Sequence, residues 1–310
     1  MLMGPWYVPA WSGGARHNTE GATKGVSGGQ YAVAVEGSGA LPGGADAPWE
    51  TPPLGRLPAV PASSSAGGTW VLLAFCGFLA GQVLSAVVVA VVAAMTGHSR
   101  DLNALMHLPV LPLWLEVASF LGLWPGFLGA VLLASYRFGS GRVGRDMGFA
   151  IRWPDILFGG IVGLAAQLVL LPVLYLPLQP FVHNLDQRLG GPAKQLTGGS
   201  GADKVVTALL TIVVVPVIEE LFFRGLLLRG LLRLFSGAGR ALGPVLAIVA
   251  NGLLFGVAHA EGLQFIGLAA VGALLAVLAY RTGRLGPSFF AHAAFNLVAV
   301  VASSSGGALH

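Results

Sequence analysis

Polar side chains that could do chemistry interrupt three apolar segments in the second half of this 310-residue chain. Ionisable groups are costly inside apolar segments and usually serve a function there. This set offers a carboxylate base, two imidazoles and an amide donor, which can activate water and stabilise an oxyanion at a carbonyl. Two imidazoles and a carboxylate are also a common zinc ligand set, with a fourth position open for water. The four candidate catalytic residues are Glu219, His259, His292 and Asn296.

The first of these segments contains two adjacent carboxylates and an arginine. Glu220 and Arg224 are four residues apart, so on a helix they share a face and can pair. Glu219 points about 100° away, toward another helix, and has no partner in its own. Pro216 removes a backbone donor one turn upstream, which predicts a kink and a free carbonyl. An ion pair between helices would explain Glu220 and Arg224 but would leave Glu219 unexplained.

The other two segments supply the histidines. His292 and Asn296 are four residues apart and share one helix face, which interhelical hydrogen bonding alone would explain. His259 ends its segment, as an interfacial histidine does. At about 1.5 Å per residue, Glu219 and His292 lie at nearly one depth, whereas His259 lies near the outer surface. A common site therefore requires the helix before His259 to begin deeper in the cytoplasm, or to tilt strongly.

The composition identifies lipid as the main solvent of the chain. Hydrophobic residues make up 55% and charged residues only 10%, whereas a soluble globular domain carries about 25% charged residues. The 17 basic residues are scattered between apolar runs and form no basic face, so we expect no nucleic-acid partner. The single cysteine, Cys76, allows neither a disulfide framework nor a cysteine-ligated metal site.

The apolar runs predict an all-α, polytopic bundle of about seven transmembrane helices. Runs such as the one from Val83 to Val92 lack the alternation of a membrane β-barrel. A carboxylate at Glu116, three residues inside its helix, is expected to reach toward the interface. The predicted helices are Thr69–Met95, Leu113–Ser135, Ile156–Leu178, Val205–Leu234, Leu242–His259, Leu263–Ala279 and Leu285–Ala302.

Three regions follow from this pattern. Residues 1–68 are rich in Gly, Pro and Ser and predict a disordered cytoplasmic tail without the features of a signal peptide. Residues 69–180 hold the N-terminal transmembrane helices, and residues 205–303 hold the candidate catalytic core. Between them, Asp186, Arg188 and Lys194 are expected in a solvated external loop.

The basic residues predict the orientation, because cytoplasmic loops carry an excess of Lys and Arg. The loops after the second, fourth and sixth helices hold nine of them, and the opposite side holds four. This puts the N-terminus in the cytoplasm of an integral membrane protein, most simply in a bacterial plasma membrane. The nine are Arg137, Arg142, Arg145, Arg152, Arg229, Arg233, Arg240, Arg281 and Arg284; the four are Arg100, Arg188, Lys194 and Lys204.

Three motifs in order resemble the CPBP family of intramembrane proteases. They are Glu219-Glu220-Leu221-Phe222-Phe223-Arg224, Phe255 to His259, and His292 to Asn296. The family groups the type II CAAX prenyl endopeptidases with bacteriocin-processing and immunity (Abi) proteins. The resemblance covers about residues 205–303. The eukaryotic-type CAAX enzymes have a further helix after the last motif, and only eight residues follow Ala302 here, which favours a bacterial-type member.

The resemblance implies a role for each matched residue. Glu219 would be the general base that polarises water together with His259, and His292 and Asn296 would donate to the oxyanion. Glu220 and Arg224 would hold their helix in place. In a metal-dependent version, Glu219, His259 and His292 would be zinc ligands, and the sequence does not separate the two versions.

These observations predict an intramembrane endopeptidase, with or without zinc, that cleaves a peptide or protein substrate within the lipid bilayer. The substrate class stays open between a prenylated C-terminus, a leader peptide and a membrane-protein segment. Two other functions compete with it: a non-catalytic immunity-type binding protein, and a proton- or ion-coupled transporter that uses Glu219, Glu220 and Arg224 as a relay. No inverted repeat of the kind found in secondary transporters is visible between the two halves.

Overall fold

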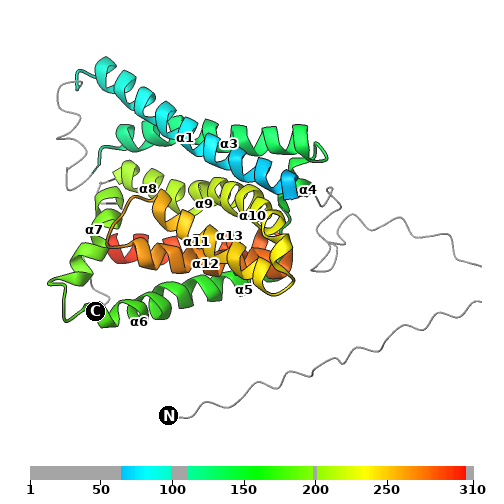
Figure 1. Cartoon of the computed structure of the whole chain (residues 1–310). Helices are drawn as coiled ribbons and strands as arrows, with labels where there is room; N and C mark the ends of the chain where they lie inside the picture. The colour runs from blue at the N-terminus through cyan, green and yellow to red at the C-terminus, as the bar shows by residue number, and fades with distance from the viewer. Residues whose placement is uncertain (1–63, 99–110, 198–200, 305–310) are drawn as a thin grey trace, which may run out of the picture. The chain divides into compact units, whose positions relative to one another are not determined.

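The computed structural model describes residues 64–98, 111–197 and 201–304, and these residues form helices and turns without a strand. The predicted all-α class is therefore confirmed for this part of the chain (Figure 1). The α-helices are α1 (Ser64–Met95), α3 (Leu113–Phe138), α4 (Val143–Met147), α5 (Trp153–Ala165), α6 (Leu171–Tyr175), α7 (Leu185–Thr197), α8 (Gly201–Leu209), α9 (Val215–Glu219), α10 (Leu228–Leu234), α11 (Leu242–Ala258), α12 (Phe265–Thr282) and α13 (Gly286–Ser304). The π-helices are η1 (Ala166–Leu170), η3 (Leu210–Val214) and η4 (Glu220–Leu227), and the 3-10 helices are η2 (Leu176–Leu178) and η5 (Ser236–Ala238).

Six spans among the described residues are long and apolar enough to cross a membrane, which makes the chain an integral membrane protein. The remaining one of the seven predicted helices is α11, an apolar helix of 17 residues that falls just short of this length. The shortness of α11 matters for the site, because its end carries His259. The six spans are Gly67–Met95, Leu113–Phe138, Trp153–Leu178, Gly201–Leu234, Phe265–Thr282 and Gly286–Ser303.

Three expectations meet a different outcome. The predicted tail lies outside the described residues up to position 63, and residues 64–68 already belong to α1. The expected external loop is largely the helix α7, whose polar and apolar residues separate on two faces. Glu116 does not reach the interface: it is 4% exposed, and the Thr207 hydroxyl donates to its carboxylate at 2.7 Å. This hydrogen bond offsets part of the desolvation free energy lost when the carboxylate is buried.

The bundle is built from pairs of packed helices, and glycines allow some of these helices to approach each other closely. α1 packs along α3, α11 along α12, and α5 along α13 (Figure 1). A Cβ added at Gly163 of α5 would lie 2.1 Å from the carbonyl oxygen of Ala291 in α13. A Cβ added at Gly159, one turn earlier, would lie 2.5 Å from the carbonyl oxygen of Pro287. This small-residue stripe lets α5 press against the helix that carries His292.

Contacts at one end of the bundle join the loops that carry the nine basic residues. Arg229 of α10 donates to the carbonyl of Gly283 in the α12–α13 turn at 2.9 Å. Arg284 of the same turn forms an ion pair with Asp155 at the start of α5. The three basic loops therefore share one end, as the charge pattern requires.

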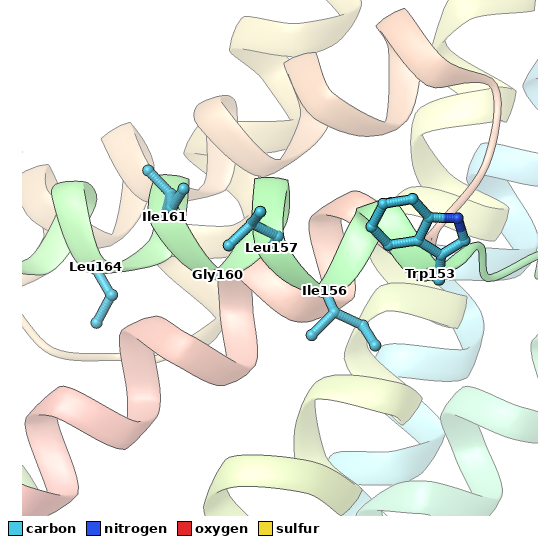
Figure 2. Close-up of a pocket in the computed structure, with 6 residues that line it drawn as sticks. All are labelled: Trp153, Ile156, Leu157, Gly160, Ile161 and Leu164. Atoms are coloured by element: carbon cyan, nitrogen blue, oxygen red, sulfur yellow. The ribbon is translucent and has the colours of Figure 1, made fainter.

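The outward face of α5 is an apolar surface suited to lipid. An open groove of about 420 Å³ lies along this helix, and its six lining residues all come from it (Figure 2). The indole N–H of Trp153 is the only polar side-chain group in the lining, so the groove holds none of the candidate catalytic chemistry. Its lining residues are Trp153, Ile156, Leu157, Gly160, Ile161 and Leu164.

The charge pattern yields a topology test. A reporter fused after Arg145, in α4, is expected to report the cytoplasm, and one fused after Gly191, in α7, the opposite side. The physical reason is the retention of Lys- and Arg-rich loops on the cytoplasmic side. Paired alkaline phosphatase and fluorescent-protein fusions measure both positions. The reverse pattern would overturn the predicted orientation.

Candidate active site

The Gly201–Leu234 segment changes its helical geometry around Pro216. In the π-helix η3 the N–H of Val215 donates to the carbonyl of Leu210, five residues back. Pro216 has no N–H to continue this pattern to Thr211. The side-chain amide of Asn296, from α13, donates to the Thr211 carbonyl at 2.8 Å instead. The carbonyl freed by the proline is thus used to hold Asn296.

Glu220, Arg224 and His292 form a buried network, which we call the support network. Nη1 of Arg224 donates to Oε1 of Glu220 at 3.0 Å, as the spacing predicts, and Nη2 donates to the carbonyl of Gly272 in α12 at 3.1 Å. Nδ1 of His292 lies 3.1 Å from the same Oε1. Glu220 and Arg224 are each 1% exposed. The network therefore ties the π-helix η4 to both α12 and α13.

Glu219 has a different environment from its neighbour Glu220. Its side chain is 16% exposed, and Oε2 lies 3.7 Å from Nε2 of His292, beyond hydrogen-bond distance. That buried oxygen has no hydrogen-bond partner among the described residues. The carboxylate lies beside the histidine with unused capacity to accept a proton or a hydrogen bond.

Phe255 brings the two histidines together. Its ring lies 4.6 Å from the ring of His259 and 5.8 Å from that of His292, measured between centroids. His259 and His292 are therefore neighbours of the same ring, as a common site requires. With 17 residues, α11 reaches only about 25 Å, less than the thickness of the hydrocarbon core.

The hydrogen bond of His259 defines its tautomer. Nδ1 lies 2.8 Å from the carbonyl oxygen of Phe255. Because a carbonyl only accepts, Nδ1 carries the proton and Nε2 keeps its lone pair. No hydrogen bond joins His259 to Glu219 or His292 within the part of the chain that the structure describes.

Asn251 is a site residue that the sequence analysis missed. It is fully buried in α11, and its amide donates to the carbonyl of Phe223 in η4 at 2.8 Å. A π-helix positions backbone carbonyls irregularly, so this contact supports the segment between Glu220 and Arg224. The signal was present in the sequence: Asn251, Phe255 and His259 are spaced four residues apart and share a helix face.

A three-ligand metal site does not fit the side chains as they lie. Among the described residues, no group of three or more His, Cys, Asp and Glu side chains is placed to hold one metal ion. Glu219 and Nε2 of His292 are adjacent, but His259 does not complete a group of three with them. Zinc at Glu219, His259 and His292 stays a prediction, and water activation by Glu219 does not require it.

Comparison with known proteins supports the motif assignment. Residues 201–298 match the sequence model of a family described as type II CAAX prenyl endopeptidase Rce1-like. This segment is Rce1-like. The resemblance to the CPBP family is thereby confirmed, and the matched residues include the support network and all four candidate catalytic residues. No curated protein and no solved structure matches the chain.

The match of this segment indicates a general class of activity. The family is one of CAAX-type intramembrane endopeptidases, which agrees with polar groups that converge inside an apolar bundle. α1, α3 and α5 lie outside the matched residues, yet α5 packs against α13 of the Rce1-like segment. The N-terminal helices therefore contribute to the positions of the candidate residues.

Proposed function

We propose that this protein is an intramembrane endopeptidase in which Glu219 activates the hydrolytic water. The observation that carries the proposal is the contrast between the two adjacent carboxylates. Oε1 of Glu220 is held by Arg224 and His292 and its side chain is 1% exposed, whereas Glu219 is 16% exposed and forms no hydrogen bond among the described residues. A general base must have such a free acceptor next to the reacting centre.

The proposed reaction is ordinary peptide hydrolysis. The water oxygen attacks the carbonyl carbon of the scissile bond while Glu219 takes a proton from that water. The carbon–nitrogen bond then breaks, and the amine nitrogen receives the proton from Glu219. The second water proton also passes to the amine, so the products are a carboxylate and an ammonium group, and Glu219 returns to its starting state.

The two histidines serve different ends of this reaction. Nε2 of His259 keeps its lone pair, so it can accept a hydrogen bond from the water and orient it toward the carbonyl carbon. His292 directs Nε2 toward Glu219 because Nδ1 is held by Glu220. With Nδ1 protonated toward Glu220, Nε2 has an N–H only in the imidazolium form, and in that form it would donate to the oxyanion together with the second amide hydrogen of Asn296.

The substrate is a peptide segment that reaches the site from the membrane. A prenylated C-terminus, a leader peptide and a membrane-protein segment all present such a segment. N-terminal proteomics of membranes from wild-type and Glu219→Gln cells tests the function directly. New N-termini that occur only with the wild-type protein would support a protease and map its cleavage sites, and identical sets of N-termini would favour a non-catalytic binding protein.

Metal analysis separates the two versions of the mechanism. If water is activated by Glu219 without metal, we expect activity to survive chelation. Asn296→Ala should then lower kcat by about a hundredfold, the usual loss for one oxyanion donor. If Glu219, His259 and His292 bind zinc, the purified protein should hold about one metal per chain, because three protein ligands and a water complete a zinc site. Inductively coupled plasma mass spectrometry of active protein measures this content.

The two outcomes exclude each other. Active protein with less than a tenth of an equivalent of transition metal would overturn zinc. Loss of activity on chelation, restored by zinc and accompanied by low metal content in His292→Ala, would overturn the metal-free version. The fixed Nδ1–H tautomer of His259 is compatible with both, because its Nε2 lone pair serves water or a metal.

A further inference from the structure

A tyrosine outside the Rce1-like segment fastens the turn that follows His259. Tyr175, the last residue of α6, is 4% exposed. Its hydroxyl donates to the carbonyl of Leu263 at 3.1 Å and accepts from the N–H of Gly267 at 3.0 Å. We call these two hydrogen bonds the tyrosine clasp. They join α6 to the α11–α12 turn on the side of the bundle where His259 lies.

The clasp satisfies groups that the turn itself leaves open. The N–H of Gly267 lies in the first turn of α12, where a helix has no internal acceptor for it. A Cβ at Gly267 would lie 2.7 Å from the Tyr175 hydroxyl, so only glycine permits this approach. The hydroxyl thus caps α12 from a neighbouring helix.

The turn held by the clasp has an unfavourable backbone conformation. Ala260, directly after His259, has a φ of 54°, in the left-handed region that residues with a Cβ rarely adopt. Such conformations persist where surrounding contacts over-determine them. The clasp supplies two of these contacts, and Gln264 adds another by donating to the carbonyl of Leu189 in α7.

We propose that Tyr175 is a positioning residue that acts through His259. His259 directly follows the last residue of α11, so the path of the turn sets the direction of its ring. The clasp keeps Nδ1 on the Phe255 carbonyl and leaves Nε2 free for the reacting water. This inference rests on the proposed function, because it assigns Tyr175 a role only if His259 orients that water.

Tyr175→Phe removes the clasp and keeps the ring. We expect kcat to fall about tenfold and KM to stay within about twofold, because misplacement of a catalytic group affects the chemical step rather than binding. The assay uses an internally quenched peptide that spans a cleavage site mapped by the proteomics above. Tyr136→Phe is the matched control, since it removes a phenolic hydroxyl from a tyrosine of α3 that is 65% exposed. An unchanged kcat for Tyr175→Phe would overturn the proposal.

A spectroscopic readout distinguishes positioning from a general loss of structure. In protein labelled with ¹⁵N-histidine, the ring signals of His259 should report the Nδ1–H tautomer, with His259→Gln used for assignment. Tyr175→Phe should shift these signals, whereas Tyr136→Phe should not. If kcat falls while the His259 signals stay in place, Tyr175 does not act through His259.

A second substitution tests the strained turn independently. Ala260→Gly removes the cost of the positive φ. By itself it should leave kcat within about twofold, and in the Tyr175→Phe background it should restore most of the lost activity. Failure of this rescue would overturn the proposed link between the clasp and the turn.

The failure of the clasp and the failure of the proposed function give different results. If His259→Gln cleaves the peptide as the wild type does, the role of His259 in the proposed function is wrong. If His259→Gln is inactive while Tyr175→Phe is fully active with unchanged ring signals, only the clasp is wrong.

Discussion

Glu219→Gln is expected to lower the rate of peptide cleavage by about 10³-fold or more, the upper range of a general-base contribution, without unfolding the protein. Glutamine has nearly the same shape, but its amide cannot accept a proton from water. The side chain is partly exposed and has no hydrogen-bond partner at Oε2 among the described residues, so the change breaks no buried hydrogen bond at that atom. Steady-state cleavage of the mapped peptide by purified variants measures the effect.

Glu116→Gln is the matched control for this variant. Glu116 is also a glutamate in a membrane span, but it is buried and its partner is the Thr207 hydroxyl on α8, away from the histidines. A glutamine oxygen can accept the same hydrogen bond, so cleavage should stay close to that of the wild type. Normal cleavage by Glu219→Gln would remove Glu219 from the mechanism, and equal losses in both variants would indicate a general effect of Glu-to-Gln changes.

Arg224→Met is expected to destabilise the protein by about 3–5 kcal/mol, because it leaves a buried carboxylate without its cation. Arg224 holds Glu220 and the Gly272 carbonyl, and its guanidinium lies 4.4 Å from the centroid of the Phe255 ring. Methionine fills part of the volume but donates no hydrogen bond. Thermal unfolding in detergent measures the loss as a lower midpoint and a smaller folded fraction.

A second substitution identifies the uncompensated charge as the cause. Glu220→Gln combined with Arg224→Met removes both charges, so the double variant should be more stable than Arg224→Met alone. Arg145→Met, an exposed arginine of α4, should change stability by no more than about 0.5 kcal/mol. A double variant as unstable as the single one would show that the lost packing and hydrogen bonds, rather than the charge, dominate.

Much of the architecture followed from hydropathy and spacing. A bilayer requires about 20 apolar residues per crossing, so hydropathy predicted a helix at each of the six spans and at α11, but not at α4 or α7. The pairing of Glu220 with Arg224 followed from their four-residue spacing, which puts both on one helix face. The same periodicity directed Glu219 toward another helix, and His292 of α13 is the residue it meets there.

The positions of the helix ends, and the residues that surround them, could not be predicted from hydropathy and spacing. Hydropathy does not show where α11 begins relative to the bilayer, so counting residues could not establish that His259 and His292 are neighbours of one ring. Its place beside Phe255 depends on a short helix and on a turn held by Tyr175, which lies 84 residues before His259 in the chain.

The sequence by itself determined the membrane location, the helical class and the inventory of polar groups that could hydrolyse a peptide bond. Only the tertiary structure decided which glutamate is free and which is locked, because that depends on contacts from α12 and α13. It also decided that the carbonyl left open by Pro216 holds Asn296. Local periodicity specifies the face on which a side chain lies, whereas its partner is set by how separate helices pack, and that information is distributed over the whole chain.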